Sequence, residues 1–138
     1  MKTTYVLEIN ESITGKQRPR MNTRTGSAYT PGKTKAYEYL VRQLFLNKYP
    51  DCEPIKGRIS ITIWAYFEVP KSTSKKKELE MLSGQISPVK KPDWDNIGKI
   101  VSDALNKFAF LDDAQIVDAR VVKEYSKTPK VIVKISEF

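Results

Sequence analysis

Apolar and polar residues alternate most regularly from Arg58 to Val69, in the stretch RISITIWAYFEV. A period of two is typical of a β-strand with one buried face, so we predict a strand here that ends at Pro70. Shorter strands are predicted at Thr4–Ile9, from Gln115 to Tyr125, and from Lys130 to Ser136. The Thr128-Pro129 break between the last two predicts a hairpin. The residues expected on the buried face of the long strand are Ile59, Ile61, Ile63, Ala65, Phe67 and Val69.

Helical spacing of apolar residues occurs in two other regions. One predicted helix opens at Thr34 and runs to about Tyr49. The other follows Pro92 and has the clearer apolar stripe. A short surface helix is expected in TSKKKELEML, capped by Ser72, Thr73 or Ser74. The stripe of the helix after Pro92 consists of Ile97, Ile100, Val101, Ala104, Leu105 and Phe108.

These elements predict an α/β (α+β) fold in which helices pack against one mixed β-sheet. The segment from Gly15 to Thr34, GKQRPRMNTRTGSAYTPGKT, is rich in Gly, Pro, Asn and Ser, and we expect it to form a long functional loop. No internal repeat or domain boundary is visible, so the prediction is a single domain over residues 1–138.

Composition narrows the chemistry. The chain has 24 Lys and Arg against 16 Asp and Glu, a formal net charge of +8, which suggests a polyanionic partner, either nucleic acid or an anionic membrane surface. The absence of histidine excludes Ser-His-Asp triads and His-ligated metal sites. The one cysteine, Cys52, is expected to be a small apolar residue near a loop. With no bilayer-length apolar run and no signal-peptide layout at the N-terminus, a cytoplasmic protein without a membrane partner is expected.

Acidic residues nevertheless gather around the helix after Pro92. Asp93 and Asp95 lie at its start, and Asp112 and Asp113 lie where the chain turns into the next strand. Each has a structural interpretation: aspartate caps helices, Asp95 and Lys99 are spaced for a surface ion pair, and Asp-Asp is common in turns. Asn96, Lys99 and Asp103 share the helix face opposite the apolar stripe.

Considered together, these acids favour a different interpretation. Carboxylates brought close to one another repel unless a cation neutralises them, and Mg²⁺ prefers carboxylate oxygens. A bound Mg²⁺ activates water and stabilises charge on a phosphoryl oxygen, so no histidine base is needed. Lys99 would then face the scissile phosphate as a further cation. Whether Asp113 lies beside Asp93 does not follow from these patterns.

Basic residues surround the acids in the sequence. Arginines on a flexible loop grip phosphates without sequence specificity, so the basic loop suggests contacts with a DNA backbone. A solvated surface is the alternative, and it is as good an interpretation for KSTSKKK. The residues predicted to bind DNA are Lys16, Arg18, Arg20, Arg24, Lys33, Lys35, Lys90 and Lys91.

The stretch KPDWDNIGKIVSDALN, followed by FLDDAQIVDARVVK, resembles the RusA family of Holliday junction resolvases of bacteria and phages. The shared pattern is Asp-x-Asp-Asn, a lysine, Asp-Ala-Leu and Asp-Asp-x-Gln. The segments GKQRPR and YTPGKTKAYE are similar to the phage-type branch. The resemblance implies that Asp93, Asp95 and Asp113 bind metal and that Lys99 is the catalytic cation. Asn96, Asp103 and Asp112 are secondary candidates.

The resemblance also implies a homodimer that nicks four-way DNA junctions with Mg²⁺, or with Mn²⁺ in its place, and uses no organic cofactor. It suggests a phage or prophage origin, and Trp64 and Tyr66 are candidates for an exposed contact between copies. Two other functions are compatible with the sequence. One is a non-catalytic module that binds branched DNA, and the other is a nuclease with a broader preference for flaps and forks.

Overall fold

The computed structural model describes residues 2–15, 20–26, 28, 29 and 32–138 of the chain. Its centre is a mixed four-stranded sheet with the strand order β1-β6-β4-β5. The strands are β1 Thr4–Ile9, β4 Ile59–Glu68, β5 Ile116–Ser126 and β6 Lys130–Glu137. β6 runs antiparallel to β1 and β4, whereas β4 and β5 are parallel. The predicted mixed sheet with packed helices is therefore confirmed.

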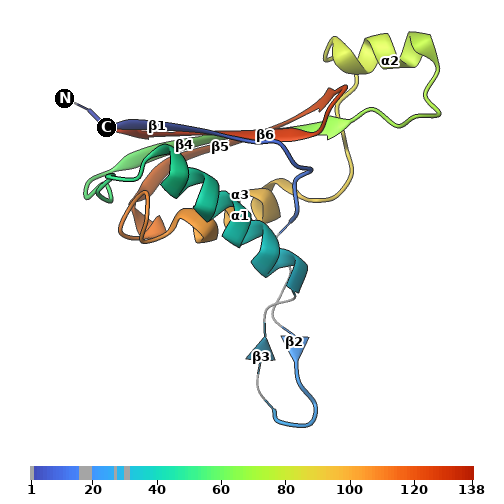
Figure 1. Ribbon diagram of the computed structural model, residues 1–138. Coiled ribbons are helices and arrows are strands. Elements are labelled where there is room, and N and C mark those ends of the chain that lie inside the picture. The colour runs from blue at the N-terminus through green and yellow to red at the C-terminus, as the bar shows by residue number, and fades with distance from the viewer. Residues whose placement is uncertain (1, 16–19, 27, 30–31) are drawn as a thin grey trace.

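Two helices cover one face of this sheet, α1 Gly32–Lys48 and α3 Trp94–Leu105. Figure 1 shows both on the same side, while α2, Lys75–Leu82, lies beyond one end of the sheet. α3 belongs to the long connection between β4 and β5, because parallel neighbours need a crossover rather than a tight turn. This crossover brings the end of α3 and the start of β5 to the same edge of the molecule.

The core forms between the helices and the inner face of the sheet. The alternating residues of β4 point into it as predicted, and Ile59 and Ala65 have no exposed surface. The α3 stripe is buried through Leu105, where the helix ends. Phe108, predicted to continue the stripe, lies in the turn that follows and packs against the core from there.

The predicted hairpin between the last two strands is wrong. β4 lies between β5 and β6 and pairs with both. The short Thr128-Pro129 connection reverses the chain direction, but it crosses the end of β4 before β6 begins. The backbone N–H of Val69 donates to the carbonyl of Ser126 at this crossing, 3.1 Å away. A turn signal predicts reversal, and it does not predict which strands become neighbours.

The predicted loop between Gly15 and Thr34 is more ordered than expected. Among its described residues, β2 (Arg20–Met21) pairs antiparallel with β3 (Ala28–Tyr29), and α1 begins at Gly32 rather than at Thr34. The Asn22 carboxamide oxygen accepts from the N–H of Arg24 at 2.9 Å and so helps to close the turn. In Figure 1 this hairpin extends away from the layer of helices.

The other face of the sheet is turned away from α1 and α3, and α2 contacts β5 at one end of the sheet (Figure 1). Trp64 and Tyr66, predicted to be exposed, lie on this face and are half-buried by their neighbours. The Lys130 ammonium lies over the Tyr66 ring, 5.3 Å from its centroid. Within the part of the chain that the structure describes, no helix is both long and apolar enough to cross a membrane.

Arg42 of α1 contacts the C-terminal end of α3. The Arg42 guanidinium donates from Nε to the Ala104 carbonyl at 3.1 Å and lies over the Phe108 ring, 4.9 Å from its centroid. The last carbonyls of a helix lack partners within the helix, and a cation there also opposes the negative end of the helix dipole. Arg42 is therefore a structural residue, although it belongs to the basic part of the sequence.

We expect Arg42→Ala to lower the free energy of unfolding by about 2 kcal/mol, because it removes a charged hydrogen bond and a ring contact together. Urea unfolding followed by circular dichroism measures this change. Arg58→Ala is the matched control, since Arg58 is exposed and its guanidinium lies over a ring too, that of Phe138, 5.1 Å from its centroid. Equal losses in the two variants would contradict the role of Arg42 in holding α3.

Candidate active site

Asp93 and Asp95 lie at the start of α3 as predicted, and both are exposed. Asp93 has the extended backbone of an N-cap residue (φ −70°, ψ 156°), yet its side chain makes no capping hydrogen bond. Capping therefore does not account for the Asp93 carboxylate. Both carboxylates lie beside the free N–H groups of the first helical turn, which favour negative charge.

The two aspartates before β5 differ in what they contact. The Asp112 carboxylate accepts from the N–H of Ala114 at 3.0 Å and forms a capping box with Gln115 around the short helix η1, Asp113–Gln115. Asp113 is half-buried and lines a pocket instead. The local geometry thus gives Asp112 a structural contact and leaves Asp113 as the acid that faces the site.

Gln115 explains how this turn is held. Its Oε1 accepts from the N–H of Asp112 at 2.8 Å. Its Nε2 donates to the carbonyls of Ile55 and Gly57 at 2.7 and 2.8 Å. The amide of Gln115 therefore ties the turn that carries Asp113 to the segment before β4. A carboxylate in its place could not donate these two hydrogen bonds.

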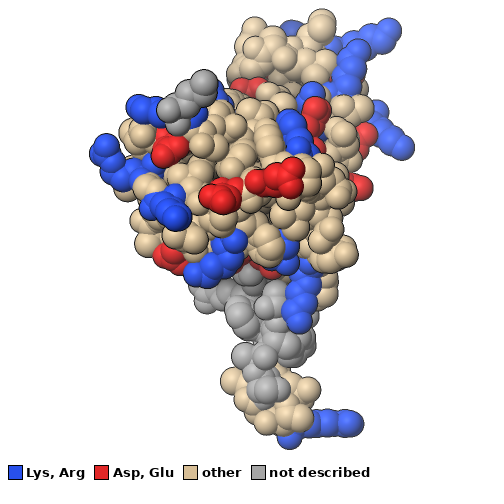
Figure 2. Space-filling view, turned by 60° about the vertical axis from the view of Figure 1, so that its left-hand side comes forward, with Lys and Arg blue, Asp and Glu red and all other residues tan. Residues whose placement is uncertain are grey.

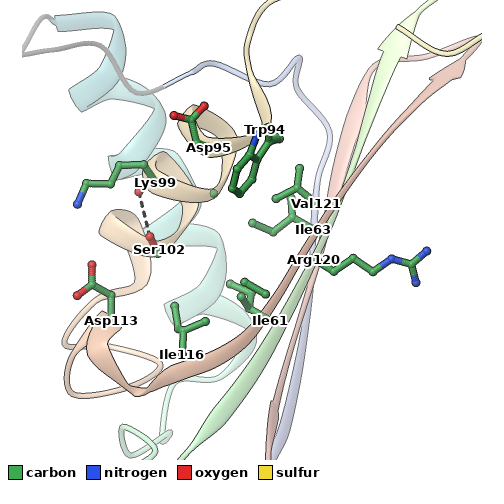
Figure 3. Close-up of a pocket in the computed structure, with 12 residues that line it drawn as sticks. Ile61, Ile63, Trp94, Asp95, Lys99, Ser102, Asp113, Ile116, Arg120 and Val121 are labelled. Atoms are coloured by element: carbon green, nitrogen blue, oxygen red, sulfur yellow. Dashed lines mark hydrogen bonds between the residues drawn. The ribbon is translucent and has the colours of Figure 1, made fainter. Parts of the chain in front are cut away.

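Lys99 pairs with Asp103, one turn after it on α3, and not with Asp95, one turn before it, as the spacing had suggested. Its Nζ lies 3.6 Å from Asp103 Oδ1, and the two side chains are 56% and 22% exposed. Figure 3 shows Asp95, Lys99 and Asp113 with their charged ends on the same side of α3. Asn96 is half-buried and borders a neighbouring hollow beside Asp93.

Three adjoining hollows run around the start of α3, and together we call them the α3 groove. The first, of about 270 Å³, is bordered by Asp95, Lys99 and Asp113. The second is bordered by Asp93, Asp95, Lys90, Lys91, Trp94 and Lys123. The third is bordered by Asp93, Asn96, Lys33 and Lys91. Asp95 is shared by the first and second hollows, and Asp93 by the second and third.

The described residues include no group of three acidic, His or Cys side chains that could hold a metal ion together. The acids of the α3 groove share hollows in pairs, Asp95 with Asp113 and Asp93 with Asp95. They are hard oxygen donors in an open groove. Mg²⁺ is commonly bound by one or two carboxylates and keeps several waters, so this donor set fits a hydrated Mg²⁺.

The predicted DNA-binding residues divide into three groups. Lys33, Lys90 and Lys91 border the α3 groove. Lys35, in the first turns of α1, and Arg24, at the turn of the β2–β3 hairpin, are exposed outside it. Lys16 and Arg18 lie outside the described residues, and Arg20 is described only as the backbone that opens β2.

Basic side chains are spread widely over the surface. Figure 2 shows Lys and Arg from the end of the molecule near α2 to the hairpin end, around acidic groups near the centre of the view. Lys90 also contacts aromatic rings, and its ammonium lies 5.8 Å from the centroid of Tyr125. Lys123 donates a short hydrogen bond to the Lys90 carbonyl. This second contact fixes the chain just before Asp93.

The sequence analysis missed two residues of the groove. The first is Trp94, which lies between Asp93 and Asp95 and is 67% exposed. It is three residues before Ile97, a spacing that would continue the apolar stripe of α3. Gly15 packs directly on the start of α3: a Cβ there would lie 2.6 Å from Cβ of Pro92 and 3.4 Å from Cβ of Asn96. The signal in the sequence is a glycine at the start of the basic segment, because glycine allows the backbone to pack closely against another element.

Cys52 is half-buried, and its thiol lies 3.9 Å from the Phe108 carbonyl. Burial is the main effect on its pKa and raises it. A nucleophilic cysteine needs a lowered pKa, so this thiol is a packing residue, as predicted.

Comparison with known proteins agrees with this arrangement. The family model described as endodeoxyribonuclease RusA matches residues 11–136. The chain is also 39% identical over 124 residues to a protein of Bacillus subtilis (strain 168) named uncharacterized protein YqaN, with 87% of each chain covered. The matched residues include the hairpin, α3, the Asp112–Gln115 turn and most of the sheet. The chain therefore belongs to the RusA family of endodeoxyribonucleases.

Proposed function

We propose that this nuclease resolves four-way DNA junctions by hydrolysing phosphodiester bonds with Mg²⁺, in the α3 groove. The observation that carries the proposal is that Asp95, Lys99 and Asp113 border one pocket in a chain of this family. Carboxylates for a hard cation, next to a lysine and open to solvent, form the kind of site that phosphodiester hydrolysis needs. Flap or fork cutting is the alternative, and relative rates on those substrates decide it.

Asp95 and Asp113, which share the first hollow, are the residues we assign to Mg²⁺. Asp93, which shares the second hollow with Asp95, is the third carboxylate. When bound, Mg²⁺, or Mn²⁺ in its place, lowers the pKa of water and stabilises charge on a phosphoryl oxygen. The residues themselves set the position of this chemistry. The Gln115 amide holds the turn of Asp113, and the buried stripe of α3 fixes the direction in which Asp95 points.

Lys99 supplies a fixed positive charge to the same pocket. Its ion pair with Asp103, the acid one turn after it, keeps the ammonium near the α3 surface. The Lys99 side chain is still 56% exposed. A phosphate that enters the pocket can replace or join Asp103 as the partner of the ammonium. Charge that grows on the phosphate during cleavage is then stabilised without a histidine.

The proposal includes a homodimer. A four-way junction has two equivalent strands to cut, and each chain has one α3 groove. Two copies related by a two-fold axis match the symmetry of that substrate. Paired nicks at symmetric positions are the product that such a dimer makes.

We expect the protein to nick a labelled synthetic four-way junction in Mg²⁺, with paired symmetric products, and to leave a linear duplex of matched sequence intact. EDTA should abolish cutting, and Asp93→Asn should abolish it while junction binding persists. The Asp93 side chain makes no capping hydrogen bond, and asparagine is equally favoured at an N-cap position, so α3 keeps its start. Gel-resolved cleavage and mobility-shift assays measure the two properties.

Binding of the junction without nicks in either Mg²⁺ or Mn²⁺ would identify a non-catalytic module and refute the proposal. Equal cutting of flaps, forks and junctions would establish the broader nuclease. Retained cutting by Asp93→Asn together with lost binding would contradict the assignment of Asp93.

Asp112 and Asp113 provide a matched pair for testing the acids. We expect Asp113→Asn to slow cutting by about 10² or more, because it removes a charge from the pocket. Asp112→Asn should change the rate by less than about threefold, since asparagine retains an oxygen that can accept from the Ala114 N–H. Single-turnover rates at saturating protein measure the difference. The reverse order of effects would assign the metal to Asp112.

The lysines at the edge of the groove should act on binding through salt dependence. Each lost phosphate contact lowers the slope of log Kd against log salt by about 1, so Lys33→Gln combined with Lys91→Gln should lower it by about 2. Lys134→Gln is the control, because Lys134 lies on the sheet face opposite α1 and α3 and is exposed. A lower slope for the control alone would put the DNA on that face.

A further inference from the structure

Trp94 is exposed to an unusual degree for its type. It lies at the first position of α3 with 67% of its surface accessible, between two acids. Tryptophan is large and is usually buried over most of its surface, and it is enriched at interfaces, where its apolar ring is covered and its N–H finds a partner. Neither packing nor the metal assignment explains why an indole is placed here.

The ring stands over an apolar hollow. Figure 3 shows Trp94 on the sheet side of α3, whereas Asp95, Lys99 and Asp113 direct their charged ends to the other side. This is the first hollow of the α3 groove, of about 270 Å³, which is also bordered by Asp95, Lys99 and Asp113. Its apolar lining consists of Ile61, Ile63, Gly98, Ile116, Ala119 and Val121.

Gly98 keeps this hollow open. A Cβ at this position would be 3.8 Å from Val121 Cγ2, in ordinary contact, so any longer side chain would project into the space. Glycine costs helix stability of about 1 kcal/mol relative to alanine in a helix interior. Its presence in the middle of α3 therefore fits a need for room beside Trp94.

The charges around the ring indicate which occupant it suits. Lys90, Lys91 and Lys123 share the second hollow of the α3 groove with Trp94, and Lys99 borders the first. An apolar face flanked by cations is the arrangement with which proteins hold unpaired nucleotides, because bases stack on the ring while cations hold the phosphates. A second protein chain would have to bring its own surface past these lysines and acids.

We propose that Trp94 and the hollow beneath it hold one nucleobase that has left the helical stack next to the branch point. The assignment rests on the proposed function, because it needs a branched DNA in the α3 groove. The base stacks on the indole, while Lys90, Lys91 and Lys99 hold the phosphates on either side. A linear duplex offers no such base without unpairing, so this site contributes preference for a branch and positions the strand over the acids.

Tryptophan fluorescence tests the contact directly. The chain has 2 tryptophans, so Trp64→Phe leaves Trp94 as the one reporter. In EDTA, where no cutting is expected, a saturating four-way junction should quench the emission, and a linear duplex bound to the same extent should not. A variant with Trp94→Phe and Trp64 retained is the control, and its emission should not change.

Substitutions test what the contact contributes. Trp94→Ala should weaken junction binding roughly tenfold, within about 5- to 150-fold, and leave duplex binding unchanged. Trp94→Tyr should restore most of the affinity. Gly98→Leu, which fills the hollow and keeps the ring, should weaken junction binding as well. Thermal unfolding of each variant confirms that the comparison is between folded proteins, and Gly98→Ala is the conservative partner that leaves the hollow open.

Unchanged Trp94 emission on saturating junction would overturn the inference, and so would full junction affinity in Trp94→Ala. A lower molar mass of free Trp94→Ala with junction affinity retained would assign the ring to a contact between copies instead. Quenching without any nicking in Mg²⁺ would refute the nuclease proposal and leave the base site standing. No junction binding at all would overturn both.

Discussion

The packing of α3 against the sheet is the constraint on which the site depends. Its stripe from Ile97 to Leu105 is fully buried, so the helix cannot rotate without exposing large apolar side chains to water. This fixes the opposite face, and Asp95 and Lys99 are held outward at a set angle. Arg42 holds the far end of the helix and Pro92 packs on Gly15 at the near end. Asp93, Asp95 and Lys99 thus stand on a rigid element, while Lys33 comes from α1 and Lys90 and Lys91 come from the loop before α3.

Electrostatics explains how a basic protein accommodates these acids. The chain carries a formal net charge of +8, and Lys33, Lys90 and Lys91 border the same groove as Asp93 and Asp95. Their positive potential reduces the repulsion between neighbouring carboxylates. The same lysines attract phosphates, which the acids alone would repel. The groove therefore combines acidic and basic groups at close range.

Much of the fold could be predicted from the sequence, because the period of the apolar residues is a local property. β4 was recognised from it to within one residue at each end, and α3 was recognised too, although its stripe was carried three residues too far, to Phe108. The hairpin prediction failed because the neighbours of β5 and β6 depend on the crossover through α3, which no local pattern contains. β2 and β3 were missed since each is only 2 residues long, too short for a period to be seen.

The site was predictable in its residue types and less so in its geometry. The resemblance named Asp93, Asp95, Lys99 and Asp113, and the structure puts three of these around one pocket. The distinction between Asp112 and Asp113 required the hydrogen bond that Asp112 accepts from the Ala114 N–H and the position of Asp113 at the pocket, which spacing does not reveal. Trp94 was missed because its position continued the apolar stripe. Only the fold shows that the core ends before this residue.

The parallel pairing of β4 with β5 has a consequence for how the protein acquires its chemistry. Asp95 and Asp113 meet only when β5 has joined the sheet, and its partner β4 lies far back in the sequence. Closing so long a loop costs conformational entropy and makes such contacts slow to form. β5 is also an edge strand, with a neighbour on one side only. A chain still emerging from the ribosome therefore carries Lys33, Lys90 and Lys91 before it has assembled the groove that they border.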